Sequence, residues 1–208
     1  SIFYIEDIDS LRFALAANDY DVLSNRPHFP GYPLYCFTLS SFYALFGSLG
    51  FSFSLIGGMC IFVLIYFTVK IYHLLTGKES YLPALILFFN PFLWLMSNRY
   101  MPDIMGLSFL VMGIYYFINY LKFKELKSLF FLGFSLGCLS GVRLSYLPFF
   151  LPVVVLFLNT KTLKPILLSC MLFFLAWFVP WIIFTDVTSL YKVALNDANG
   201  HFYRWGGT

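Results

Sequence analysis

The sequence predicts an all-α protein: a polytopic transmembrane helix bundle with short amphipathic helices at the membrane surface. Sixty per cent of its 208 residues are hydrophobic, the mean hydropathy is +0.80, and only 11% of residues are charged. Soluble domains carry roughly 25% charged residues. Long apolar runs alternate with short polar gaps, as in a chain that crosses a bilayer repeatedly. Membrane lipid is therefore an expected partner, whereas a pI of about 8.6 gives no indication of nucleic-acid binding.

The charges in the polar gaps divide the chain into two sides. Lysine and arginine near span ends are retained on the cytoplasmic side. The gaps predicted to be inner carry seven lysines and two glutamates, and the outer segments carry six basic and eight acidic residues. The inner lysines are Lys70, Lys78, Lys122, Lys124, Lys127, Lys161 and Lys164. Residues 6–49 and 186–208 are thus predicted to be extracytoplasmic.

The first outer segment is predicted to hold two juxtamembrane helices. Residues 6–29 are polar and contain a short, imperfect amphipathic helix. Its apolar positions are Ile8, Leu11, Phe13, Leu15 and Ala16. After a break at residues 30–33, residues 34–46 form an aromatic, apolar run of about 13 residues, which is too short to span unaided. We expect this second helix to lie at the interface, with full insertion as the alternative.

About six spans are expected between residues 51 and 185. Their approximate limits are 51–75, 81–97, 103–121, 128–142, 144–158 and 165–184. Asn90-Pro91 is predicted to kink the second span, because proline breaks the helical hydrogen-bond ladder. Gly133, Gly137 and Gly141 recur every four residues, a spacing that favours close helix packing in lipid.

We expect residues 1–208 to form one membrane domain. It comprises the outer segment 6–49, the spans within 51–185 and the start of a further outer loop at 186–208. The sequence begins in an apolar stub without methionine and stops in a polar loop. These two features suggest truncation at both ends, with a first span and a C-terminal part missing.

All five arginines lie in outer segments or at an outer helix end. They are Arg12, Arg26, Arg99, Arg143 and Arg204. Lysine suffices for topology, whereas the planar guanidinium group holds phosphate oxygens in a bidentate manner. The arginines therefore indicate a phosphate or pyrophosphate ligand at the outer face. The alternatives are surface ion pairs with the outer carboxylates, or simple snorkelling of Arg143 at the end of its helix.

Asp9 and Asp103 are the candidate catalytic residues. Charged groups close to the membrane are costly and tend to be functional. Asp103 has a second interpretation as a helix N-cap, and Asp7 competes with Asp9 from two residues away. Because the sequence has no CxxC motif or Cys/His pair, it predicts no disulfide framework and no zinc site. We expect no cofactor, although a divalent metal stays open.

The order of these features resembles the GT-C glycosyltransferases, in the branch of protein O-mannosyltransferases and the lipid A aminoarabinose transferase. Asp9, Phe13 and Ala16 match the Asp, Tyr and Ala of that branch's Asp-Glu-x-x-Tyr-x-x-Ala motif. Ser10 replaces the glutamate and so removes one carboxylate. The proline-rich stretch 26–33, the turn Met101-Pro102-Asp103, Arg143 and the loop with His201 and Arg204 occur in the family's order.

The resemblance implies a glycosyltransferase with a GT-C-like fold, which moves a hexose or pentose from a polyprenyl-phosphate sugar to an acceptor. The acceptor would be a protein or a lipid-linked glycan at the extracytoplasmic face. Asp9 would be the general base, and Asp103 would orient the acceptor or a basic group. Arg12, Arg143, His201 and Arg204 would bind the donor phosphate, with Arg26 and Arg99 as further substrate-binding candidates.

A transporter or flippase of a lipid-linked sugar is the alternative function. Such a protein should show charged residues near mid-span and internal repeats, and these spans show neither. We expect the protein in the plasma membrane of a bacterium or archaeon rather than in the ER membrane.

Overall fold

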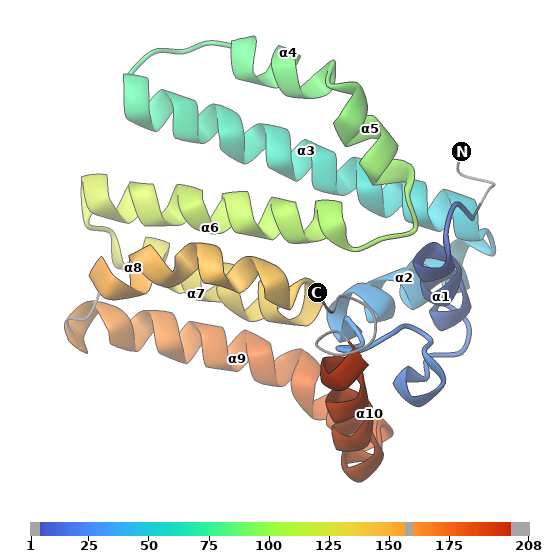
Figure 1. Cartoon of the computed structure of the whole chain (residues 1–208). Coiled ribbons are helices and arrows are strands. Elements are labelled where there is room, and N and C mark those ends of the chain that lie inside the picture. Colours follow the sequence, from blue (N-terminus) through green and yellow to red (C-terminus); the bar gives the residue numbers. More distant parts are fainter. Residues whose placement is uncertain (1–4, 157–159, 201–208) are drawn as a thin grey trace.

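The computed structural model describes residues 5–156 and 160–200, and it confirms the helical fold class (Figure 1). Helices account for 82% of the structure, and the described residues form no β-strand. The elements in chain order are α1 (Ile8–Ala16), η1 (Val22–Ser24), α2 (Pro33–Phe46), α3 (Leu49–Thr76), α4 (Leu82–Phe88), α5 (Pro91–Asn98), α6 (Asp103–Phe123), α7 (Leu126–Val142), η2 (Leu144–Phe150), α8 (Leu151–Leu156), α9 (Thr160–Phe184) and α10 (Val187–Asn199).

Three helices, α3, α6 and α9, are long and apolar enough to cross a membrane. The other predicted spans look different: α7 has 17 residues, and two others are divided, into α4 with α5 and η2 with α8. Asn90 caps α5 with its side chain and Pro91 occupies the first turn, so the predicted interruption there is confirmed. The other divided segment begins as a 3₁₀-helix that contains Pro148. The total number of crossings therefore stays a prediction.

The bundle has two chemically different ends. Helices α3, α6, α7 and α9 lie side by side, and α1, α2 and α10 gather at one end (Figure 1). The connections α3–α4 and α6–α7 lie at the opposite end. The lysines that the sequence assigns to the inner side lie in these two connections or in the neighbouring turns of α3, α6, α7 and α9. The segments predicted to be outer thus lie together at one end of the molecule.

The glycine stripe of α7 (Gly133, Gly137 and Gly141) makes a close helix contact, as predicted, and the partner is α9. A Cβ at Gly133 would lie 2.4 Å from the Ile166 carbonyl oxygen, and one at Gly137 would lie 2.6 Å from that of Cys170. The close approach lets the Trp177 indole N–H donate to the Gly137 carbonyl at 2.9 Å. Small residues allow helix backbones to approach in this way, and here they hold the tryptophan face of α9 against α7.

We expect Gly57→Ala to destabilise the bundle by about 1–3 kcal/mol, the typical cost of overpacking. A Cβ at Gly57 would lie 2.0 Å from the carbonyl oxygen of Ser97, so α3 and α5 would have to separate. The neighbouring Gly58 has no atom within 4 Å of its added Cβ, which makes Gly58→Ala a matched control. Thermal unfolding in detergent would measure the difference, and equal midpoints for the two variants would contradict the packing described here.

The juxtamembrane helices differ in part from expectation. In α1 the buried side is formed by Phe13, Ala14 and Ala16, whereas Ile8 stays 62% exposed. The reason is that this nine-residue helix packs on α2 by one side only, through Phe13 and Tyr35. Helix α2 has 14 residues, about 21 Å, and contacts α3, α7 and α9. Helix α2 therefore lies across one end of the bundle, and α1 packs on it.

Candidate functional site at the α1, α2 and α10 end

Asp7 builds the N-terminus of α1. Its carboxylate accepts a hydrogen bond from the Ser10 backbone N–H at 2.7 Å and also pairs with Arg99. That backbone hydrogen bond, together with the Arg99 guanidinium, lowers the pKa of Asp7 below its usual range. Arg99 makes a second ion pair, with Glu6 at 3.2 Å. Asp7 and Arg99 therefore fasten α1 to the α5–α6 turn, and neither lines the cavities described below.

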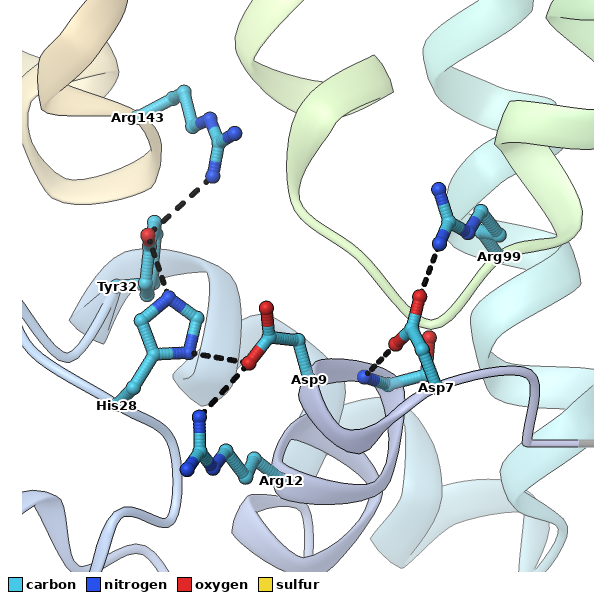
Figure 2. Close-up of polar contacts among 8 residues, drawn as sticks. Asp7, Asp9, Arg12, His28, Tyr32, Arg99 and Arg143 are labelled. Carbon is cyan, nitrogen blue, oxygen red and sulfur yellow. Dashed lines mark hydrogen bonds and ion pairs between the residues drawn. The ribbon is translucent and has the colours of Figure 1, made fainter. Parts of the chain in front are cut away.

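Asp9 lies two residues further on and faces a different group of side chains (Figure 2). Its Oδ1 accepts a hydrogen bond from Arg12 Nη1 at 2.9 Å. The same oxygen lies 3.5 Å from Nδ1 of His28. Both contacts fall on Oδ1, and no contact from the described residues falls on Oδ2. Oδ1 of Asp9 is thus held by two neighbouring side chains.

The loop before α2 brings His28 and Tyr32 into this site. Gly31 and Tyr32 both have left-handed backbone conformations, with φ of 90° and 45°, and Tyr32 precedes the first turn of α2. Tyr20 donates a hydrogen bond from its hydroxyl to the Gly31 carbonyl at 3.0 Å, which fixes the turn. The Phe13 ring makes edge contacts with both His28 and Tyr32. This buried aromatic cluster orients the two polar side chains.

Asp103 and Arg143 form an ion pair at 3.0 Å between the start of α6 and the end of α7. Their side chains are only 16% and 23% exposed. A Cβ at Gly106 would lie 2.8 Å from the Arg143 Cβ, so this glycine lets the arginine approach α6. The N-cap residue of α6 is Pro102, without a side-chain capping bond. The capping interpretation of Asp103 is therefore wrong, since its carboxylate contacts Arg143 instead.

These side chains form one continuous polar network. Arg143 donates from Nη1 to the Tyr32 hydroxyl at 3.3 Å, and that hydroxyl lies 3.1 Å from Nε2 of His28. With the contacts above, the network runs from Asp9 through His28, Tyr32 and Arg143 to Asp103. Figure 2 shows it from Asp9 to Arg143. The two candidate catalytic aspartates thus share one network, although they do not contact one another directly.

Three buried polar atoms in the network have no hydrogen-bond partner among the described residues. They are Nδ1 of His28, Oδ2 of Asp103 and Nε of Arg143. Buried polar atoms in native structures are almost always paired with protein or water. His28 and Arg143 also line a polar hollow, described below.

The remaining candidates from the sequence lie elsewhere. Arg26 pairs with Asp19 and with Asp21, the latter at 3.4 Å, and so closes the turn around η1. His201 and Arg204 lie outside the residues that the structure describes. Of the six basic candidates, the structure brings Arg12 and Arg143 into the network, and it places Arg26 and Arg99 in ion pairs outside it.

Two polar hollows adjoin the network and share Asp9, His28 and Asp197. The first, of about 500 Å³, lies between α1, the loop before α2, and α10. The second, of about 440 Å³, reaches Tyr32 and Arg143. Asp197 on α10 lines both hollows, and a charge pattern alone did not distinguish it from the other outer acids. His28 was equally without an assigned role, and its only signal was its place in the proline-rich stretch, directly after Arg26-Pro27.

An apolar groove of about 190 Å³ continues from the second hollow. The two share Phe29, Pro30, Tyr32 and Leu144 in their linings. The far wall of the groove is aromatic and belongs to α9: Phe174, Trp177, Phe178 and Trp181. The site therefore joins an apolar groove to polar hollows at the point where Arg143 and His28 lie.

The site has a neutral histidine and no excess of positive charge. Burial lowers the pKa of His28 below its ordinary value, and the neighbouring Asp9 carboxylate acts in the opposite direction. His28 is accordingly neutral at neutral pH. The aspartates at 9, 103 and 197 outnumber Arg12 and Arg143, so the described side chains provide no surplus of positive charge. Within the described residues, no three His, Cys, Asp or Glu side chains are grouped so that they could hold a metal ion.

One comparison with known proteins gives a match. The model of a family described as dolichyl-phosphate-mannose-protein mannosyltransferase matches residues 26–184. No curated protein and no solved structure matches the chain. The matched region contains His28, Tyr32, Asp103 and Arg143, and it begins after α1. The position of Asp9 therefore rests on its motif and on its contacts with the matched region.

Proposed function

Because the chain belongs to the dolichyl-phosphate-mannose-protein mannosyltransferase family of GT-C membrane glycosyltransferases, we propose that it transfers a sugar from a polyprenyl-phosphate donor. The acceptor is a hydroxyl group of a protein or of a lipid-linked glycan. Transfer takes place at the end of the bundle formed by α1, α2 and α10, which faces the extracytoplasmic side. The membrane is the plasma membrane of a bacterium or archaeon.

The observation that carries this proposal is the junction of an apolar groove with a polar network. A polyprenyl-phosphate sugar has an isoprenoid tail, an anionic phosphate and a polyhydroxylated head. The groove along Trp177 and Trp181 offers an apolar surface beside lipid-exposed helices. Arg143 lies where the groove meets the second hollow, and charge-assisted hydrogen bonds from arginine suit a phosphate. The sugar would then lie near Asp9 and His28.

In the proposed reaction, Asp9 acts on the acceptor and Arg143 acts on the leaving phosphate. Asp9 accepts the proton of the acceptor hydroxyl as the new bond forms from that oxygen to the anomeric carbon of the donor. The bond from this carbon to the phosphate oxygen breaks, and the phosphate leaves with the bonding electrons. Arg143 stabilises the charge that develops on the leaving phosphate, as a preorganised donor does. Asp103 holds Arg143, and Arg12 holds Oδ1 of Asp9. His201, Arg204, Arg26 and Arg99 remain further candidates for the substrate.

The extracytoplasmic assignment rests on the charges of the two bundle ends. The end opposite the site carries the lysine-rich connections, and lysine near span ends favours the cytoplasmic side. A site on the far side has no access to cytoplasmic nucleotide sugars. The activated sugar must then arrive attached to a lipid.

The test is transfer by the intact protein in proteoliposomes. Polyprenyl-phosphate hexoses and pentoses are compared with the corresponding nucleotide sugars, using a hydroxyl-bearing peptide and a lipid-linked glycan as acceptors. We expect turnover with a lipid-phosphate donor. Turnover with nucleotide sugar alone, in lipid without prenyl phosphate, would overturn the proposal. Movement of the lipid-linked sugar across the bilayer without transfer would favour the flippase function instead.

A further inference from the structure

The hydrogen bonds around Tyr32 have a defined direction. Arg143 can only donate, so the Tyr32 hydroxyl accepts from it and has one proton left to give. The nearest nitrogen is Nε2 of His28 at 3.1 Å. Burial raises the pKa of Tyr32 above its usual value, so the hydroxyl keeps its proton. Tyr32 therefore donates to His28.

This direction fixes the tautomer of a neutral His28. A neutral imidazole carries one N–H, and if Nε2 accepts from Tyr32 the proton must lie on Nδ1. Nδ1 lies 3.5 Å from Oδ1 of Asp9, within ion-pair distance, and has no hydrogen-bond partner among the described residues. Catalytic hydrogen bonds are often long before substrate binds and shorten in the complex. The four side chains thus form a series of donors that ends on Asp9.

We propose that His28 is a positioning residue, which orients the Asp9 carboxylate through Nδ1–H and links it through Tyr32 to Arg143. The proposal rests on the proposed function, because Asp9 is the base and Arg143 the phosphate ligand in that reaction. In this role His28 fixes the position of the base, Asp9, relative to the phosphate-binding group, Arg143. His28 itself contacts neither the transferred proton nor the phosphate. The charged groups that face His28 are Asp9 and Arg12 from α1, Asp197 from α10 and Arg143 from the end of α7.

Two substitutions of His28 separate its two contacts. In His28→Asn the side-chain amide occupies the place of Nδ1 and can still donate to Asp9, but it does not reach Tyr32. In His28→Gln the amide reaches the place of Nε2 and Tyr32, but the contact with Asp9 is lost. We expect His28→Gln to lower kcat about 10- to 100-fold, as for a catalytic group misplaced by about 1 Å. We expect His28→Asn to retain several-fold more activity, and the donor KM to stay within about twofold in both.

Tyr32→Phe, combined with His28→Gln, tests whether Tyr32 and His28 act in one network. It removes the hydroxyl between Arg143 and His28 and leaves the ring contacts of Tyr32 with Phe13 and His28. Combined with His28→Gln it should cost no more than His28→Gln alone, because residues of one network are not additive. Fully additive losses, or equal activity of His28→Asn and His28→Gln, would overturn the positioning role.

The tautomer of His28 can be measured without any transfer reaction, so it tests this inference independently of the proposed function. The chain has three histidines, so ¹⁵N-histidine labelling of the intact protein in nanodiscs gives few signals, and His28→Asn identifies the signal of His28. We expect the neutral Nδ1–H tautomer at pH 7.5, with a change of tautomer in Tyr32→Phe and in Asp9→Asn. An Nε2–H tautomer in the unmodified protein would overturn the inference. If the tautomer is as expected and no lipid-phosphate sugar is transferred, the proposed function fails and the arrangement of His28 stands.

Discussion

Asp9→Asn is expected to lower the rate of sugar transfer about 10²-fold or more, the typical loss when a general base is removed. The amide has the same shape as the carboxylate, so α1 and its contact with α2 through Phe13 should stay intact. What is lost is an oxygen basic enough to accept the acceptor proton. Transfer should be measured with the intact protein in proteoliposomes at equal expression, and thermal unfolding should show that the fold persists.

Asp7→Asn is the matched control for this variant. Asp7 caps α1 and pairs with Arg99, and asparagine is as good an N-cap as aspartate. Transfer should therefore fall only slightly, and the loss of the ion pair should appear as a small decrease in the unfolding midpoint. A larger loss of transfer in Asp7→Asn than in Asp9→Asn would show that the base has been assigned to the wrong aspartate.

The features that could be predicted from the sequence are those that depend on regular helices. Helical period and composition gave the apolar helices, Asn90-Pro91 gave the break before α5, and the four-residue glycine spacing gave close helix packing by α7. That the partner is α9 required the structure. The ends of helices were also predictable, since proline, glycine and charge act locally there. For this reason Asp103 and Arg143 were correctly expected at helix ends. Their direct ion pair required the three-dimensional approach of α6 and α7 at Gly106.

The network between the aspartates was not predictable in the same way. His28 and Tyr32 lie in a non-periodic loop whose path depends on left-handed Gly31 and Tyr32 and on a hydrogen bond from Tyr20. No repeating pattern encodes such a path. Helix patterns also say nothing about Asp197, because its role follows from where α10 lies relative to α1.

Among the ion pairs of the arginines, one could be expected from the sequence and another could not. The pairing of Arg26 with Asp19 and Asp21 is local, and the alternative of surface ion pairs covered it. Arg99 pairs with Asp7 across 92 positions of sequence, which only the fold reveals. Arg143 differs from Arg26 and Arg99 because it lines the second polar hollow, which shares Tyr32 and Leu144 with the apolar groove. This position is why we propose Arg143 as the ligand of the donor phosphate.

Arg143→Lys is expected to recover only part of the function that Arg143→Ala loses. Removing the guanidinium should lower kcat/KM for the lipid-phosphate donor by about 1.5–3 kcal/mol, the range for hydrogen bonds to charged groups. This corresponds to about 10- to 150-fold in rate. Lysine keeps a positive charge but offers a single ammonium group in place of a planar fork, so it cannot contact Asp103, Tyr32 and a phosphate in the same geometry.

The design must separate donor binding from the stability of the site. Arg143→Ala leaves Asp103 buried without its cation, which by itself is strongly destabilising. The double variant Arg143→Ala with Asp103→Asn removes that buried charge, so a loss of kcat/KM that persists in it at an unchanged unfolding midpoint reports on the donor. Arg26→Ala is the matched control, because this arginine pairs only with the acidic residues of its own turn. If Arg26→Ala raises the donor KM as much as Arg143→Lys does, the phosphate lies near η1 and not at the end of α7.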